Sequence, residues 1–385
     1  MGREVLSGNG DREEFGLSWS VSPSVSMRYD VRVSEPLLGR GNRELLAGGP
    51  VPGRRFVVCD NGVPTSWQDS LACYFNYHGV DARILIVEGG ERCKRTEMIF
   101  EIIDEFEKFG LVRRNEPVLI IGGGALMDAV SLAAAIYRRG VPFIKVPTTL
   151  LAYVDASIGI KTAINFNGKK NLVGSFSAPL VVLLDRGFFR TLPNREISSG
   201  LSEILKLGIG CDEQLFYHLE ALAPEVIFED KFQSQGAMIL TRAIEVMIRE
   251  LEPNIHEDNL CRAVDLGHTF SQVFEMSFGE DALRHGEAVA LDLNLSCIVA
   301  NQRGLLDDDA LRRVAMLTKT LGLPTKVPEA DPGELWYSVA ERTRHRGGLQ
   351  RIPLPCRIGE SVFVNDVTSS EVGNAYEFLL KRYWQ

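Results

Sequence analysis

Two histidines and one glutamate are the strongest candidates for metal chemistry in this sequence. His268 in DLGHTF and His285 in RHGEAVA each lie beside a glycine near the start of a helical stretch, and Glu203 lies in the predicted helix SSGLSEILKLGI. A carboxylate and two imidazoles can hold Zn²⁺ and leave positions open for substrate oxygens. A second interpretation stays open, because Glu203 and Lys206 share one helix face and a surface ion pair has the same pattern.

A second group of polar residues lies in the segment PTTLLAYVDASIGIKTAINFNGKKN, residues 147–171. Its polar members include Thr148, Thr149, Asp155, Lys161, Lys169, Lys170 and Asn171. This polarity is unusual beside a core strand, and the intervening apolar residues indicate that the segment is held against the body of the protein. We predict a loop that carries part of the site; a solvated loop with an ordinary share of lysine is the alternative.

A glycine turn predicts a nucleotide site. Gly122, Gly123 and Gly124 join a buried strand to a helix, where backbone N–H groups and the helix dipole can hold a phosphate. The turn is not the GxGxxG fingerprint, so a purely structural turn is the alternative. Asp60 follows an earlier strand and Glu91 follows the next one. Because the carboxyl ends of parallel strands meet at one edge, these residues favour a nucleotide across that edge.

The order of elements predicts an α/β fold. Apolar strands alternate with helices in ARILIVEGGE, MIFEIIDEFEKFG, PVLIIGGG, ALMDAVSLAAAIYRRG and VPFIKVPTT, which indicates a Rossmann-like parallel sheet covered on both faces. After about Leu192 long helical stretches dominate. We predict a mobile leader at residues 1–26, an α/β nucleotide-binding domain at 27–192 and a mostly α-helical domain at 193–385.

Composition and charge exclude several classes of protein. The chain has 385 residues, 45% of them hydrophobic, and a formal net charge of −9, which disfavours nucleic acid as a partner. It has neither an apolar run of about 18 residues nor the core of a signal peptide, so we expect a cytoplasmic protein with no membrane partner. Its 7 cysteines contain no CxxC pair, which favours reduced thiols.

Taken in order, these motifs resemble the sugar phosphate cyclases, the family of dehydroquinate synthase. GGGALMD, residues 147–171, SSGLSEILK, DLGHTF and RHGEAV carry the resemblance over most of the chain. It implies a dehydroquinate synthase-like fold with an N-terminal NAD-binding domain, a C-terminal helical domain, bound NAD⁺, a Zn²⁺ or Co²⁺ ion on Glu203, His268 and His285, and commonly a homodimer. The implied NAD contacts are Asp60, Glu91, Lys94, Gly123, Gly124, Asp128, Thr148, Thr149 and Lys170.

One difference from dehydroquinate synthases concerns the substrate carboxylate. Those enzymes have an arginine after the leucine of an ExGLR segment, and the matching stretch here runs from Glu257 to Cys261. A neutral thiol cannot form the bidentate pair that a guanidinium forms with a carboxylate. Arg262 is adjacent, but one residue along a helix it would point about 100° away. The sequence therefore predicts a sugar phosphate substrate that has no carboxylate.

Asp265 in VDLGHT and His345 in RHRGGLQRIPLP are similar to the 2-epi-5-epi-valiolone synthases of C7-cyclitol biosynthesis. This resemblance implies that sedoheptulose 7-phosphate is cyclised to 2-epi-5-epi-valiolone with release of phosphate. The implied steps are transient oxidation by NAD⁺, β-elimination, re-reduction and intramolecular aldol closure. The implied catalytic residues are Lys161, Lys206, Asp155, Asn171, Asp265 and His345.

Several alternatives stay open at this point. Ala163, Lys169 and Leu172 depart from the pattern usual in that family, so a cyclase that makes 2-epi-valiolone or another cyclitol is one alternative. A metal-dependent NAD alcohol or glycerol dehydrogenase is a second alternative, because such enzymes share the fold and the nucleotide site. A ligand-binding homologue without catalysis is the third.

Overall fold

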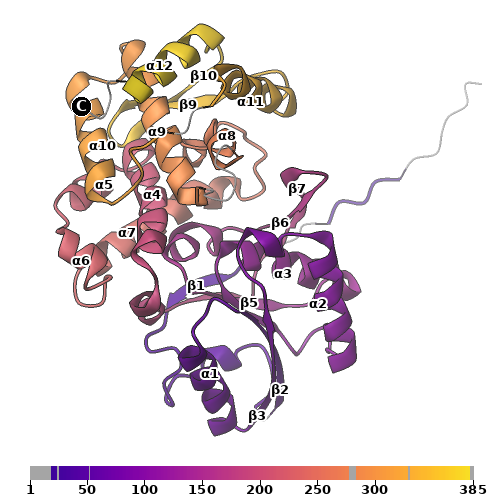
Figure 1. The fold of residues 1–385 in the computed structure, drawn as a ribbon. Helices are drawn as coiled ribbons and strands as arrows, with labels where there is room; N and C mark the ends of the chain where they lie inside the picture. Colours follow the sequence, from indigo (N-terminus) through magenta and orange to yellow (C-terminus); the bar gives the residue numbers. More distant parts are fainter. Residues whose placement is uncertain (1–18, 24–25, 52, 277–282, 328–329, 382–385) are drawn as a thin grey trace, which may run out of the picture.

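The computed structural model describes residues 19–23, 26–51, 53–276, 283–327 and 330–381. Most of the predicted leader, residues 1–26, lies outside the described residues. The N-terminal half of the chain is built around a sheet, and the C-terminal half is mostly helical (Figure 1).

A parallel sheet organises the N-terminal half. Its strands are β1 (Asp30–Val33), β2 (Gly53–Asp60), β3 (Val80–Val87), β4 (Val118–Gly122), β5 (Phe143–Pro147) and β8 (Val181–Leu184). They are hydrogen-bonded in the order β1-β8-β5-β4-β2-β3, and every pair is parallel. The central strands β4, β5 and β8 are buried along their whole length, as in sheets covered on both faces. The predicted Rossmann-like sheet is therefore confirmed.

Helices cover both faces of this sheet. They are α1 (Thr65–Tyr77), α2 (Thr96–Phe109) and α3 (Gly124–Ile136). Side chains of α2 and α3 form one core with the sheet, and side chains of α1 form the other core together with Leu37, Leu45 and Leu46. Helix α2 ends at Gly110 in the left-handed conformation, with φ 67° and ψ 45°, which explains why a glycine stands there.

Helices make up most of the C-terminal half. They are α4 (Asn194–Gly210), α5 (Glu213–Glu220), α6 (Pro224–Phe228), α7 (Ala237–Leu251), α8 (Ser271–Met276), α9 (His285–Gln302), α10 (Asp308–Thr320), α11 (Pro332–His345) and α12 (Ser369–Lys381). Helix α9 is buried along nearly its whole length and contacts α4, α8, α10 and α12. None of the described helices combines the length and hydropathy that a membrane span requires.

The two halves share one hydrophobic core. Val182 and Leu184 of β8 belong to the same buried cluster as the central helices of the C-terminal half. The sheet ends at Leu184, and α4 begins at Asn194. The predicted domain boundary at residues 192 and 193 falls between these two elements and stays a prediction.

The prediction of a loop over residues 147–171 is wrong for its second half. A hairpin forms from β6 (Lys161–Phe166) and β7 (Lys169–Phe176), and Figure 1 shows it beside the helical half. Asn167 and Gly168 connect the strands with φ values of 49° and 73°. An Asn-Gly pair between strands is a strong hairpin signal, because the favoured tight turn needs positive φ at both positions. A second hairpin, β9 (Ile352–Arg357) with β10 (Glu360–Val364), lies in the C-terminal half and was not predicted.

Candidate active site

Three predicted metal ligands converge from distant parts of the chain. Glu203 lies on α4, His268 follows the 3₁₀ turn Ala263–Asp265, and His285 is the first residue of α9. One ligand atom from each residue lies within 4.8 Å of the others. The close approach of α9 to α4 depends on Gly286, since a Cβ there would lie 1.9 Å from the carbonyl oxygen of Ser199.

Hydrogen bonds orient both imidazole rings. Nδ1 of His268 lies 3.2 Å from the carbonyl oxygen of Leu266, and Nδ1 of His285 lies 2.8 Å from Oε1 of Glu275. The two Nε2 atoms then face Oε1 of Glu203, at 3.8 Å for His268 and 3.5 Å for His285. That buried oxygen accepts no hydrogen bond within the described part of the chain. An orphaned carboxylate oxygen facing two oriented nitrogens fits a divalent cation.

Neighbouring charges shift the pKa values of this cluster. Burial lowers the pKa of His268 to about 4. Burial also opposes the charged form of His285, but the nearby carboxylates of Glu203 and Glu275 raise its pKa to about 10. Burial would raise the pKa of Glu203, whereas Lys206 and the two histidines hold it well below its usual range. The cluster therefore keeps an ionised carboxylate at its centre, which favours a cation electrostatically.

An ammonium group links this cluster to the turn that carries Asp155. Nζ of Lys206 lies 2.5 Å from Oε2 of Glu203 and 3.1 Å from Oδ2 of Asp155. Glu203 is 0% exposed and Lys206 is 2% exposed, so the interpretation as a surface ion pair is wrong. Burial would lower the pKa of Lys206, but Asp155 and Glu203 raise it. Asp155 lies in the π-helical turn Ala152–Ala156, and burial raises its pKa.

Two glycines make room for Asp60 at the edge of the sheet. Asp60 ends β2, next to the point between β2 and β4 where the strand order reverses. A Cβ at Gly89 would lie 2.0 Å from the Asp60 carboxylate, and one at Gly122 would lie 2.8 Å from its Cβ. Gly123 precedes α3 and Gly124 begins it. This edge has the form of a nucleotide site, in which ligands lie at the switch point of strand order.

The remaining nucleotide candidates form two groups. Nζ of Lys94 donates to Oδ2 of Asp128 at 2.7 Å and to the side-chain oxygen of Asn171, so a residue predicted to be catalytic lies among predicted NAD contacts. Lys170, predicted to bind NAD, pairs with Glu275, which contacts His285, and its Nζ also lies 4.0 Å from Oε1 of Glu91.

The other predicted NAD contacts lie near these two groups. Oε1 of Glu91 accepts a hydrogen bond of 2.7 Å from Asn165. Thr148 donates its N–H to the carbonyl oxygen of Gly122 at 2.9 Å, and the hydroxyl of Thr149 accepts from the N–H of Ala152 at 3.2 Å. The roles predicted for all these residues stay predictions.

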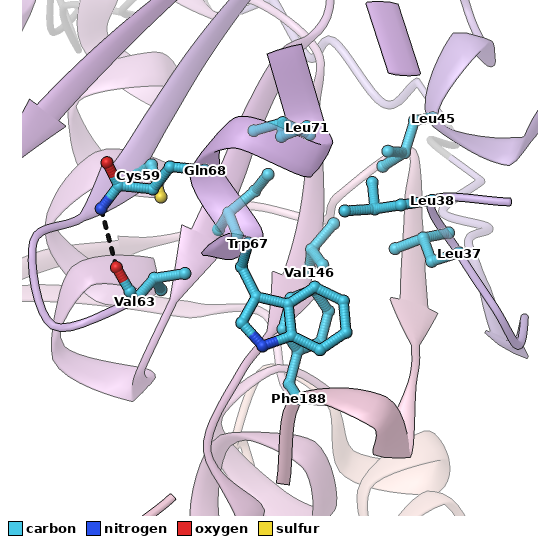
Figure 2. Close-up of a pocket in the computed structure, with 11 residues that line it drawn as sticks. Leu37, Leu38, Leu45, Cys59, Val63, Trp67, Gln68, Leu71, Val146 and Phe188 are labelled. Atoms are coloured by element: carbon cyan, nitrogen blue, oxygen red, sulfur yellow. Dashed lines mark hydrogen bonds between the residues drawn. The ribbon is translucent and has the colours of Figure 1, made fainter. Parts of the chain in front are cut away.

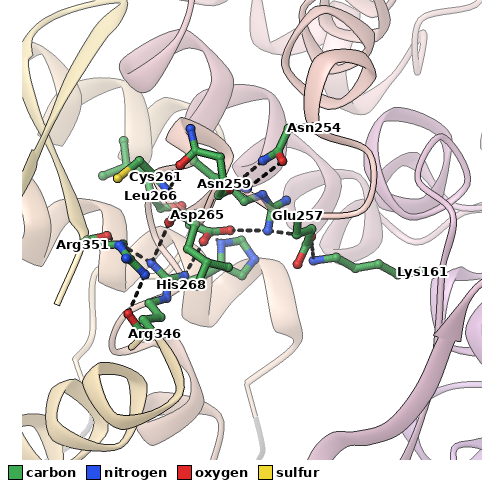
Figure 3. Close-up of polar contacts among 12 residues, drawn as sticks. Lys161, Asn254, Glu257, Asn259, Cys261, Asp265, Leu266, His268, Arg346 and Arg351 are labelled. Carbon is green, nitrogen blue, oxygen red and sulfur yellow. Dashed lines mark hydrogen bonds and ion pairs between the residues drawn. The ribbon is translucent and has the colours of Figure 1, made fainter. Parts of the chain in front are cut away.

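An arginine-rich network lies beside His268 (Figure 3). Nη1 of Arg262 lies 3.0 Å from Asp265 and 2.6 Å from Glu257, and Arg346 also pairs with Asp265. The expectation that Arg262 points away is wrong, because Arg262 precedes a short 3₁₀ turn rather than lying in a helix. Lys161, from β6, pairs with Glu257 of the helical half.

His345 does not join this network. It is the last residue of α11, and its side chain is exposed. Two arginines near it in sequence contact the site instead: Arg346 pairs with Asp265, and Arg342 donates to the carbonyl oxygen of His268.

Comparison with known proteins agrees with this geometry. The model of the 3-dehydroquinate synthase N-terminal region matches residues 84–199, and that of the C-terminal region matches residues 200–344. The chain belongs to the 3-dehydroquinate synthase family. It is 43% identical to 2-epi-5-epi-valiolone synthase of Streptomyces albus, over 92% of this chain and 88% of that protein. A solved structure of ValA, the 2-epi-5-epi-valiolone synthase of Streptomyces hygroscopicus subsp. jinggangensis 5008 with NAD⁺ and Zn²⁺ bound, is 39% identical. It matches with a TM-score of 0.89, over 94% of this chain and 100% of that one.

Sequence reasoning missed two buried carboxylates in this member of the family. Burial would raise the pKa of Glu275, but His285 and Lys170 lower it to about 2. Asp292 of α9 accepts hydrogen bonds from the N–H of Ser271 at 2.8 Å and the hydroxyl of Ser296 at 3.0 Å, and so holds the start of α8. Both residues left a signal, because each is a lone acid in an otherwise uncharged, largely apolar stretch.

A small apolar cavity lies on the α1 side of the sheet (Figure 2). Its lining includes Leu37, Cys59, Trp67 and Phe188, and its volume of about 10 Å³ has room for about one water molecule. Its one polar side chain, Gln68, already donates to the carbonyl oxygen of Val63 at 2.7 Å. None of the predicted site residues lines this cavity.

Proposed function

We propose that the protein is a sugar phosphate cyclase, a phosphate-eliminating lyase that converts sedoheptulose 7-phosphate to 2-epi-5-epi-valiolone with NAD⁺ and Zn²⁺ or Co²⁺. The observation that carries the proposal is the convergence of Glu203, His268 and His285 beside the Lys206–Asp155 pair. It occurs in a chain 43% identical to a relative that bears this name.

The two cofactors would occupy the edge of the sheet and the metal cluster. Asp60 and the Gly123–Gly124 turn would hold NAD⁺, which would supply a reversible hydride acceptor. A Zn²⁺ or Co²⁺ ion held by Glu203, His268 and His285 would supply a Lewis acid for substrate oxygens.

The chain's own groups orient the sugar and move its protons. Lys206 keeps its charge between two carboxylates, so its Nζ donates hydrogen bonds to the sugar oxygen that gains negative charge. Asp155 holds Lys206 in place, and its raised pKa suits proton exchange with a sugar hydroxyl.

Lys161 is the natural partner of the leaving phosphate. Its side chain is 56% exposed and paired with Glu257, so a phosphate dianion would compete with that carboxylate for the ammonium. β-Elimination removes a proton from C6 and releases phosphate from C7. The phosphate itself can take the proton, so the proposal needs no separate protein base.

The arginine network suits a sugar that has no carboxylate. Asp265 and Glu257 partly neutralise Arg262, and Asp265 also pairs with Arg346. A substrate carboxylate would have to compete with these internal carboxylates, whereas a hydroxyl can share their hydrogen bonds. We assign to Asp265 and Arg346 the hydroxyl contacts predicted for Asp265 and His345.

The test is turnover of a defined substrate. Purified protein loaded with Zn²⁺ or Co²⁺ is incubated with sedoheptulose 7-phosphate and NAD⁺, while phosphate release and NADH absorbance are followed. We expect one phosphate per sugar consumed, no net NADH and a new carbocycle whose NMR coupling constants match 2-epi-5-epi-valiolone.

Other outcomes would redirect the assignment. Coupling constants of a different epimer would support cyclase activity and assign a different product. Steady accumulation of NADH with an alcohol or glycerol would favour a dehydrogenase. Absence of phosphate release by folded protein with full metal and NAD⁺ content would contradict the proposed substrate, and absence of any turnover would favour a non-catalytic homologue.

We also propose a homodimer, which rests on the family resemblance. Light scattering of the purified protein should give about twice the chain mass of 42.7 kDa. A monomer at the concentrations of the turnover assay would contradict this part of the proposal.

A further inference from the structure

A buried lysine interrupts the central sheet. Lys145 is the middle residue of β5, where it is 0% exposed and in register with Ile120 of β4 and Val182 of β8. It is the one charged residue in β4, β5 and β8. An isolated ammonium is costly to bury unless hydrogen bonds compensate it, and burial lowers the pKa of Lys145 to about 8.

The ammonium donates to backbone carbonyls of one turn. Nζ of Lys145 lies 2.9 Å from the carbonyl oxygen of Gly159 and 3.4 Å from that of Ala156. Between these two, the carbonyl oxygen of Ile158 accepts a hydrogen bond of 2.5 Å from the hydroxyl of Tyr29. Side chains from distant elements therefore anchor three carbonyls within four residues.

This turn contacts both parts of the active site. It carries Asp155, whose Oδ2 lies 3.1 Å from Nζ of Lys206. On its other side, Ala156 packs against the glycine turn, since a Cβ at Gly124 would lie 2.9 Å from the Cβ of Ala156. A shift of the turn would move Asp155 relative to Lys206 and to the nucleotide edge together.

We propose that Lys145 is a positioning residue: by binding the carbonyls of Ala156 and Gly159, it fixes the turn that directs Asp155 at Lys206. Lys145 itself touches none of the ionisable groups of the metal cluster. Its effect on turnover rests on the proposed function, whereas its effect on the order of the turn does not.

The test compares Lys145→Met and Lys145→Gln with a matched control. Methionine keeps an unbranched side chain, one atom shorter than that of lysine, and has no donor, whereas glutamine keeps a neutral donor. Ile144→Val removes one buried methylene from the neighbouring position of the same strand, on the face that packs with α1, away from the turn. Each protein, with cofactors bound, is measured for hydrogen exchange in a peptide spanning residues 152–159, for kcat and KM with sedoheptulose 7-phosphate, and for Tm.

We expect Lys145→Met to accelerate exchange in that peptide at least about tenfold, because its carbonyl anchors are lost. We expect kcat to fall about 100-fold with KM changed less than about threefold, as for a misplaced catalytic group. The kcat of Lys145→Gln should be about tenfold higher than that of Lys145→Met, because the glutamine side chain retains a donor. Ile144→Val should lower Tm and leave both local exchange and kcat within about twofold of wild type.

Unchanged exchange at residues 152–159 in Lys145→Met would overturn the inference. The inference would also be overturned if kcat fell in proportion to the loss of Tm in both Lys145→Met and Ile144→Val, because that result assigns Lys145 a purely structural role. If the wild-type protein fails to turn over the sugar phosphate, the proposed function fails, and the exchange comparison still decides the role of Lys145.

Discussion

The nucleotide edge and the metal cluster are built in different ways. At the edge, Asp60 is the last residue of β2 and Gly123 directly follows β4, and glycines open the space around the Asp60 carboxylate. At the cluster, the side chains of Glu203, His268 and His285 come from three separate segments, and they meet where Glu203 is buried, His268 half-buried and His285 exposed. A site made by backbone turns is visible in a short stretch of sequence, whereas a site made by converging side chains depends on long-range packing.

The same difference predicts how the two regions respond to mutation. The nucleotide edge depends on the space that its glycines leave open, so an added methyl group at one of them should weaken nucleotide binding. The cluster depends on charge balance, since Lys206, His285 and Glu275 each shift a neighbour's pKa. Variants in one region should therefore leave ligand binding in the other region intact.

The largest effect is expected from Glu203→Gln. Loss of the charged central ligand should remove the bound metal and lower kcat by about 10³-fold, since metal polarisation contributes several kcal/mol. NAD⁺ affinity should stay within about twofold if the two regions are independent. Elemental analysis and a fluorescence titration with NAD⁺ measure both effects.

Glu196→Gln is the matched control for that experiment. Glu196 lies on the same helix and pairs with Arg284 rather than with the cluster. The Glu196→Gln protein should retain the bound metal. Full metal content in Glu203→Gln would contradict the assignment of this ligand.

The second effect concerns proton release on metal binding. Near pH 8, His268, whose pKa is about 4, is already neutral, whereas His285, whose pKa is about 10, is protonated. Since a metal binds the neutral imidazole, Zn²⁺ binding should release about one proton. Calorimetry in buffers of different ionisation enthalpy measures this number.

Glu275→Gln sharpens the same measurement. Removing this carboxylate should lower the pKa of His285, so fewer protons are released, and metal affinity should fall about 10-fold to 100-fold, as for other partners of metal-binding histidines. Wild-type proton release and affinity in this variant would show that Glu275 does not orient His285.

A smaller effect is expected from Gly89→Ala at the nucleotide edge. The new Cβ would lie 2.0 Å from the Asp60 carboxylate and displace it, so the Kd for NAD⁺ should rise about tenfold while metal content stays unchanged. Gly373→Ala is the control, because a Cβ there meets nothing within 4 Å. Loss of metal in Gly89→Ala would break the proposed independence of the two regions.

The smallest effect is expected from Asp265→Asn in acid. Burial would raise the pKa of Asp265, but Arg262, Arg342 and Arg346 lower it to about 2. The ionised carboxylate therefore stabilises the fold above its unfolded pKa of about 4, and this contribution is lost as the pH falls from about 4 toward 2. The Tm of Asp265→Asn should lie a few degrees below wild type at pH 7, and the gap should narrow at pH 3.5. A difference in Tm between Asp265→Asn and wild type that does not change with pH would contradict the ionic origin of this stabilisation.

Local patterns predicted part of the fold and missed another part. The apolar runs of β4 and β5 and the glycine stop after α2 are short-range signals, and they placed the sheet and its helices correctly. The hairpin of β6 and β7 was missed because its polar residues resembled a loop, although Asn167–Gly168 carried the turn signal. Arg262 was misplaced because a helix was assumed where the chain forms a short turn.

The sequence by itself determined the parallel sheet, the glycine turn at its edge and the three candidate metal ligands. These features depend on hydrophobic period, turn chemistry and residue type, which are properties of short segments. Only the tertiary structure decided that Lys206 is buried between Asp155 and Glu203, that Glu275 holds His285, and that arginines surround Asp265. Charges placed far apart along the chain acquire partners and shifted pKa values only when packing removes them from water.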